Sequence, residues 1–134
     1  MKSSLENGDR VLMKFINPLP FVADIDRAKT FYADLLGIPI VEDDGSFVKF
    51  ANGCALHDGA ALYRIIFGND ITEEGPFGRS NLVLYFEVKD LLAAYDRVAG
   101  RVKLIHAVQL QAWGQHVFRF YDLDGHIVEV GEPM

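Results

Sequence analysis

The sequence predicts one α+β domain made of two copies of a β-α-β-β-β unit. Two segments have the apolar spacing of amphipathic helices, and each follows an aspartate that can cap its first turn. The segment Val88–Leu91 repeats the pattern of Val22–Ile25, and Asn-Gly or Asp-Gly hairpin signals follow both helices. Because neither helix alone could cover its sheet, two similar units that share a core are the simplest arrangement.

Length and composition limit the class of protein. A chain of 134 residues, half of them hydrophobic, can bury a core without disulfides or structural metals. Cys54 is the single cysteine and cannot form an internal disulfide, which fits a reducing compartment. The N-terminal residues lack the pattern of a signal peptide, so a cytoplasmic protein is expected. No run of about 18 apolar residues occurs, so no membrane span is expected. The net charge of −6 argues against a nucleic-acid-binding surface.

The polar residues 1–12 are expected to form a flexible leader, before a domain over residues 13–134. Module one is expected at about 13–67, a loop at 68–79 and module two at about 80–132. The first predicted strand, Phe15–Val22, has Asn17, Leu19 and Phe21 on one face. Its two prolines cannot donate ladder hydrogen bonds, so this strand is expected at an edge or partly unpaired.

The first helix is predicted to begin after Asp24 and to end at Gly37, since its apolar positions run from Ile25 to Leu35. Three short strands are expected after it, and the segment that follows them fits a short helix slightly better than a strand. The ranges are 38–42, 46–50 and 54–58 for the strands, and 60–67 for the helix.

The second unit repeats this order. A strand at 80–88 is followed by Asp90 as a second cap and by a helix that Gly100 should stop. Three more strands complete the unit, at 102–106, 116–122 and 126–130, with Asp124-Gly125 as the last hairpin turn.

The segments PFVADIDRAKTFYADLLGIPI and FRFYDLDGHIVEVGE resemble the vicinal oxygen chelate superfamily. That superfamily includes glyoxalase I, bleomycin-resistance proteins, fosfomycin-resistance enzymes and extradiol dioxygenases. The resemblance covers Phe15 to Glu132 and implies paired βαβββ modules in a curled, mostly antiparallel open barrel. It places the helices on the convex side and the ligand on the concave side.

In the metal-dependent members of this superfamily, side chains from four strands hold a divalent cation. The resemblance places those positions at Asn17, Val83, Glu129 and either Ala55 or His57, because the register of that strand is open. Valine cannot bind a metal, and two good ligands are fewer than a catalytic site generally keeps. We therefore favour no metal; a bound Ni, Zn, Mn or Fe would rest on His57 and Glu129.

The cavity is expected to lie opposite the face that packs under the helices. If Phe118 and Phe120 pack there, Arg119 projects into the cavity and favours a ligand with an acidic group. Alternatively, Arg119 is a structural partner of Glu129, across neighbouring strands, or of Glu87. His106, His116 and His126 are expected at strand ends, the last two facing solvent, and Cys54 receives no nucleophilic role. The expected ligand-binding side chains are Asn17, Phe21, His57, Trp113, Arg119, Tyr121 and Glu129.

Two functions are compatible with these residues. The favoured one is a protein that binds or sequesters a small aromatic or acidic molecule inside the curled sheet. The alternative is a divalent-metal-dependent lyase, isomerase or dioxygenase of the glyoxalase type. A symmetric homodimer is expected, because the resemblance implies a cavity completed by a second subunit and the first strand leaves unpaired edge groups.

Overall fold

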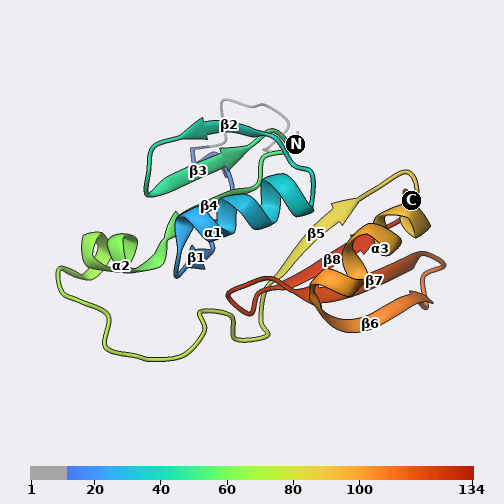
Figure 1. Ribbon diagram of the computed structural model, residues 1–134. Helices are drawn as coiled ribbons and strands as arrows, with labels where there is room; N and C mark the ends of the chain where they lie inside the picture. The colour runs from blue at the N-terminus through green and yellow to red at the C-terminus, as the bar shows by residue number, and fades with distance from the viewer. Residues whose placement is uncertain (1–11) are drawn as a thin grey trace.

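The computed structural model describes residues 12–134, so the predicted leader at 1–12 falls almost entirely outside the described residues. Two four-stranded sheets are connected by the long segment after α2 (Gly59–Phe67). Figure 1 shows α1 between the two sheets and α3 against the second one. Among the described residues, no helix is long and apolar enough to cross a membrane.

Module one has the predicted order of elements. Its strands pair in the order β1-β4-β3-β2, with β1 parallel to β4 and the other pairs antiparallel. The elements before α2 are β1 (Phe21–Val22), α1 (Ile25–Lys29), a π-helix η3 (Thr30–Leu35), β2 (Ile40–Asp43), β3 (Phe47–Phe50) and β4 (Ala55–Asp58). The ambiguous segment after β4 is therefore helical.

Module two repeats the order. Its sheet runs β5-β8-β7-β6, and β5 is again parallel to β8. The elements are β5 (Val83–Glu87), α3 (Leu91–Val98), a 3-10 turn η4 (Ala99–Arg101), β6 (Lys103–Leu110), β7 (His116–Tyr121) and β8 (Ile127–Gly131). The same pairing order in two sheets that do not close confirms the predicted α+β fold of paired βαβββ modules.

Both helices begin where the sequence places them. The Asp24 carboxylate accepts hydrogen bonds from the backbone N–H groups of Asp26 and Arg27, each at 3.1 Å. The Asp90 carboxylate accepts from Ala93 N–H at 3.0 Å. Each aspartate thereby satisfies a donor that the first helical turn leaves free.

Several predicted boundaries are wrong, and three of them have a clear physical consequence. The first ladder strand is only Phe21–Val22, because Pro18 and Pro20 lack the N–H groups that a longer ladder needs. It does lie at the sheet edge, as expected. The second helix does not stop at Gly100 but tightens into η4 through Arg101. The strand predicted to end at His106 continues to Leu110, with register shifts on both sides of His106.

One apolar core joins the two modules. Phe118 and Phe120 are fully buried and pack beneath the helices. The ring of Phe118 meets Tyr95 of α3 at 5.2 Å, and that of Phe120 meets Phe31 of module one at 6.4 Å. Because side chains alternate along a strand, this packing turns Arg119 to the opposite face of β7.

A buried network around Asp122 connects the modules. Its carboxylate accepts from the Tyr32 hydroxyl at 2.7 Å and from the backbone N–H groups of Asp124 and His126 at 2.9 Å. Asp124 in turn accepts from Ala23 N–H at 2.8 Å. Burial raises the pKa of Tyr32 well above its ordinary value, so the hydroxyl keeps its proton and donates it.

His126 extends this junction. Only 6% of it is exposed, so its predicted solvent-facing position is wrong. Its Nε2 lies 2.8 Å from the carbonyl oxygen of Phe21, which fixes β1 to the start of β8.

Nearby, Gly78 donates its N–H to Asp124 O at 2.9 Å, and a Cβ at Gly78 would lie 2.0 Å from the Gly125 oxygen. Only glycine fits this close approach.

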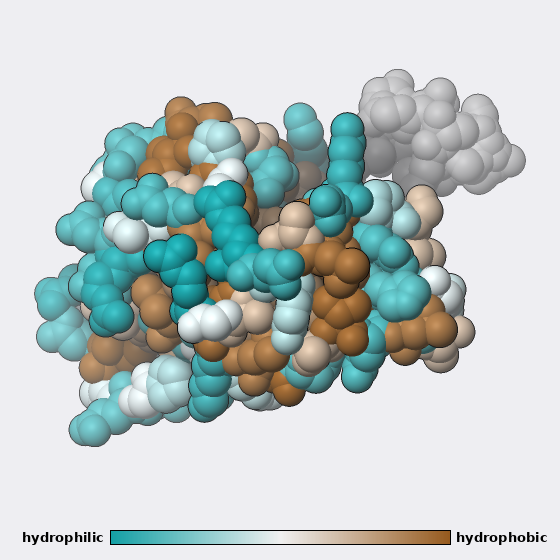
Figure 2. All heavy atoms as spheres, turned by 45° about the vertical axis from the view of Figure 1, so that its right-hand side comes forward, coloured by the Kyte–Doolittle hydropathy of each residue, from teal (hydrophilic) through white to brown (hydrophobic). Residues whose placement is uncertain are grey.

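Apolar side chains reach the surface in several places among polar ones (Figure 2). Large exposed side chains include Val83 and Tyr85 on β5, Leu110 at the end of β6, and Trp113 in the following turn. All four belong to module two and lie away from the packed helices. Val83 and Tyr85 share one face of β5, and exposed apolar groups that lie together are typical of a binding surface.

Candidate functional site

The candidate site is the face of the second sheet that lies opposite its helices, here called the open face. One row of side chains crosses all four strands on this face, because Tyr85, Glu129, Arg119 and His106 are successive ladder partners. We call these four residues the polar row. Strand alternation places the buried Leu84, Phe118 and Val128 on the other face.

Arg119 is the centre of the polar row. Its Nε donates to Glu129 Oε1 at 2.8 Å, and its Nη2 donates to Gln111 Oε1 at 3.1 Å. Its Nη1 lies 2.9 Å from His106 Nε2. The side chains of Arg119 and Glu129 are only 22% and 14% exposed, so the ion pair is partly protected from solvent. The alternative pairing of Arg119 with Glu129 is thus the arrangement present.

These contacts fix the tautomer of His106. Arginine has only donors, so His106 Nε2 accepts, and its Nδ1 carries the hydrogen that reaches Ala107 O at 2.8 Å. Sequence reasoning placed His106 at a strand end and missed it. Simple alternation assigns it the face of Leu104, which packs against the core, but the bulge between these two residues turns His106 to the open face.

An aromatic rim begins at Tyr85, the member of the polar row on the edge strand β5. Trp113 and Tyr85 are 54% and 47% exposed, and Gln115, which is 3% exposed, joins them. Trp113 Nε1 donates to Gln115 Oε1, and Gln115 Nε2 donates to the Tyr85 hydroxyl, both at 2.8 Å. The Tyr85 hydroxyl donates to Glu87 Oε2 at 3.0 Å. Gln115 was not predicted, because nothing in a turn sequence indicates a buried amide.

A cleft of about 420 Å³ lies where β5 meets the first module. Val83, Tyr85 and Glu87 form one wall, and Pro18, Pro20, Cys54 and Ala55 belong to the other. Burial raises the pKa of the Cys54 thiol to about 11, so it is protonated at neutral pH and unsuited to nucleophilic attack. Because most of its lining residues are apolar and its thiol is uncharged, the cleft is a mainly apolar space next to the polar row.

The other predicted residues lie in separate places. Tyr121 is on the open face one row from Arg119, with Lys103 Nζ 5.4 Å from its ring centre. Phe21 and His57 are ladder partners on the first sheet, and Phe77 packs against Phe21 at 5.6 Å. Asn17 is half-buried and donates to Pro18 O at 2.8 Å. Within residues 12–134, Asn17, Phe21 and His57 make no hydrogen bond to the polar row.

The register decides which residue of β4 matches Glu129. Phe21 pairs with His57 just before the first cap, and Glu87 pairs with Gly131 just before the second. His57 therefore corresponds to Gly131, and Ala55 corresponds to Glu129. The four positions are then Asn17, Ala55, Val83 and Glu129, with one carboxylate that already binds Arg119. This donor set does not fit a divalent metal, and no alternative His, Cys, Asp or Glu cluster occurs in the described residues.

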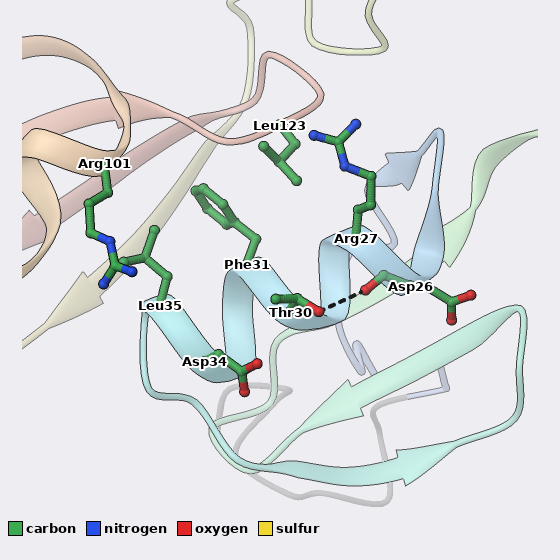
Figure 3. Close-up of a pocket in the computed structure, with 8 residues that line it drawn as sticks. All are labelled: Asp26, Arg27, Thr30, Phe31, Asp34, Leu35, Arg101 and Leu123. Atoms are coloured by element: carbon green, nitrogen blue, oxygen red, sulfur yellow. Dashed lines mark hydrogen bonds between the residues drawn. The ribbon is translucent and has the colours of Figure 1, made fainter.

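A second hollow, of about 510 Å³, lies on the helix side (Figure 3). Phe31 of η3, Leu123 of the β7–β8 turn and two arginines, Arg27 and Arg101, line it. The carboxylates of Asp26 and Asp34 point away from Phe31 and Leu123 in this view. Its polar groups do not converge as those of the polar row do, so it is not the candidate site.

The paired modules, together with the family match given next, support membership of the vicinal oxygen chelate superfamily. Residues 15–134 match the model of the glyoxalase-like domain, and the chain belongs to that family. No curated protein matches the chain in sequence.

Solved structures show the same fold. A protein of unknown function from Agrobacterium tumefaciens str. C58 is 52% identical, with a TM-score of 0.87 over 91% of this chain and 95% of that one. A lactoylglutathione lyase from Agrobacterium tumefaciens is 24% identical, with a TM-score of 0.64 over 89% and 92%. A glyoxalase/bleomycin resistance protein/dioxygenase from Nocardioides is 22% identical, with a TM-score of 0.69 over 91% and 85%. The last two similarities concern the fold alone.

Proposed function

We propose that the open face of the second sheet binds a small, planar, uncharged aromatic molecule without a metal. The observation that carries this proposal is the ion pair between Arg119 and Glu129 at 2.8 Å. Glu129 occupies a family metal position, yet its partner is a guanidinium. The Arg119 guanidinium balances the charge that a metal ion would otherwise balance, and Glu129 Oε2 can still accept a hydrogen bond.

The charges near the ion pair favour an uncharged ligand. Arg119 and Glu129 neutralise each other, and the nearby Lys103 and Glu87 also have opposite charges. The guanidinium has five N–H donors, and three of its hydrogen-bonding contacts are assigned above. The remaining donors and Glu129 Oε2 offer both donor and acceptor sites. A ligand with an amide or hydroxyl group on a flat ring matches this pattern.

The aromatic rim supports a flat ligand. Trp113 and Tyr85 are half exposed at the β5 end of the polar row, and Tyr121 lies one row away. Aromatic side chains bind planar molecules by stacking, which adds to the burial of apolar area. The neighbouring cleft provides apolar walls for the rest of such a molecule.

Two naphthalene derivatives test the ligand class. The neutral 2-naphthamide at 100 times its dissociation constant should raise the free energy of unfolding by about 2.7 kcal/mol. The acidic 2-naphthoate, added at the same concentration, should raise it less because it binds more weakly. Thermal-shift measurements compare the two probes. A larger shift with 2-naphthoate, or no shift with 2-naphthamide, would contradict the proposal of an uncharged aromatic ligand.

Metal content tests the competing function, a metal-dependent lyase, isomerase or dioxygenase. Protein purified without chelator should hold much less than one tightly bound transition metal per chain, because the donor set contains one engaged carboxylate. If elemental analysis finds near-stoichiometric Ni, Zn, Mn or Fe that is lost in Glu129→Ala, the metal-dependent enzyme becomes the supported function. The variant Glu42→Ala, which changes an exposed carboxylate on β2, serves as control.

The site is proposed to function in a symmetric homodimer. The exposed Leu110 on the edge strand β6 supports this assembly, because a partner would cover apolar area that the monomer leaves in water. Light scattering measures the mass. A monomer mass at all workable concentrations would exclude the dimer and leave the binding site to one chain.

A further inference from the structure

We infer that Gln115 is a positioning residue that holds Trp113 and Tyr85 as the two stacking surfaces of the site. This inference rests on the proposed function, since it assigns a device to the same open face. The amide of Gln115 is almost completely buried, although both aromatic side chains that it joins are half exposed. A buried polar group normally supports structure, but here its bonds go to groups at the surface.

All hydrogen-bonding groups of the Gln115 amide have defined uses. Its oxygen accepts from Trp113 Nε1 at 2.8 Å, and its nitrogen donates to the Tyr85 hydroxyl at 2.8 Å and to Glu132 O at 2.7 Å. One planar amide therefore spans the β6–β7 turn, β5 and the segment after β8. Its geometry couples the positions of the two rings, which belong to elements far apart in the sequence.

The backbone makes room for this amide. A Cβ on Gly131 would lie 2.5 Å from Gln115 Nε2, so any larger residue would displace the side chain. The turn that carries Trp113 is closed by hydrogen bonds from Gln111 N–H to Gln115 O at 2.8 Å and from Gly114 N–H to Gln111 O at 2.9 Å. Gly114 has a φ of +94°, a conformation that glycine adopts without strain.

The bonding pattern specifies how a ligand contacts the rim. The indole N–H of Trp113 and the hydroxyl of Tyr85 are already engaged at their polar edges. Their remaining exposed surface is aromatic, so a ligand meets it by stacking and forms its hydrogen bonds with Arg119 and Glu129. Rings held in place before binding lose little conformational freedom, which increases affinity.

Trp113 is the only tryptophan in the chain, so its fluorescence reports on this rim alone. Gln115→Met removes all three amide hydrogen bonds, whereas Gln115→Glu keeps an acceptor for Trp113 and loses the donors to the Tyr85 hydroxyl and Glu132 O. The control is Gln109→Met, which changes an exposed glutamine of β6. Acrylamide quenching and fluorescence anisotropy of Trp113 are measured without ligand, and 2-naphthamide affinity is measured by calorimetry.

We expect Gln115→Met to increase quenching and to lower anisotropy, while Gln115→Glu and Gln109→Met stay close to the unmodified protein. The affinity for 2-naphthamide should fall about fivefold in Gln115→Met, the equivalent of one net hydrogen bond. Quenching that is unchanged in Gln115→Met would overturn the positioning role. If Gln115→Met does not fold, greater quenching in Gln115→Glu than in Gln109→Met would overturn the stated bonding pattern, and equal quenching would support it. If the unmodified protein binds no 2-naphthamide while Gln115→Met still frees Trp113, the proposed function fails and the positioning role stands.

Discussion

The two modules share a strand order but differ on the face opposite their helices. In module one, Phe21, Phe47 and His57 lie together there, and Phe77 from the connecting loop packs on Phe21. In module two, the corresponding face carries the polar row and the aromatic rim. The position that holds Glu129 in module two holds Ala55 in module one, and Val83 corresponds to Asn17. The two modules thus share their strand order, but only module two has the Arg119–Glu129 ion pair on the face opposite its helices.

The strength of the junction between the modules is the first test of this comparison. Asp122→Ala removes the acceptor of three hydrogen bonds and leaves the Tyr32 hydroxyl without a partner. We expect the free energy of unfolding to fall by about 3 kcal/mol, measured by urea denaturation. Asp34→Ala, an exposed aspartate of η3, should change it by less than about 0.5 kcal/mol. Equal effects of the two changes would mean that the modules are stable without this junction.

The ion pair of module two is the second test. Glu129→Leu leaves Arg119 partly buried without its carboxylate, and Arg119→Leu leaves Glu129 without its guanidinium. The losses of stability in the two single variants should therefore add up to more than the loss in the double variant. A double-mutant cycle in urea should give a coupling energy of about 1–2 kcal/mol. A coupling energy near zero would show that Arg119 does not depend on Glu129 and remains available to an acidic ligand.

The helix caps offer the finest comparison. Asp24→Ala and Asp90→Ala should each cost about 1 kcal/mol of stability, because each removes an N-cap acceptor. The loss at Asp24 should be the larger, since it accepts from two N–H groups and Asp90 from one. Thermal unfolding of both variants measures the difference, and the opposite order would reverse the inferred ranking of the two caps.

Much of the fold could be predicted, because local signals agree with the final structure. The two aspartate caps, the hairpin glycines and the alternation around Arg119 act over a few residues, and the structure has them as expected. The first strand was predicted too long, because alternation alone overlooks how strongly Pro18 and Pro20 limit a ladder.

The site was less accessible to sequence reasoning, because its contacts depend on pairing between distant segments. His106 reaches Arg119 only through a bulge in β6. The choice between Ala55 and His57 required the register of β4 against β1. Gln115 acts through partners 30 and 17 residues away, and no local pattern encodes such bonds.

The junction around Asp122 also has a consequence for synthesis on the ribosome. The Ala23 N–H bonds to a side chain 101 residues later, and the carbonyl of Phe21 to one 105 residues later. The first strand of module one can pair with β4 early, but these two bonds form only after Asp124 and His126 have emerged. Contacts of such long separation form late and slow folding. The sheet of module one can therefore assemble first, whereas the junction that joins it to module two is completed only with the last hairpin.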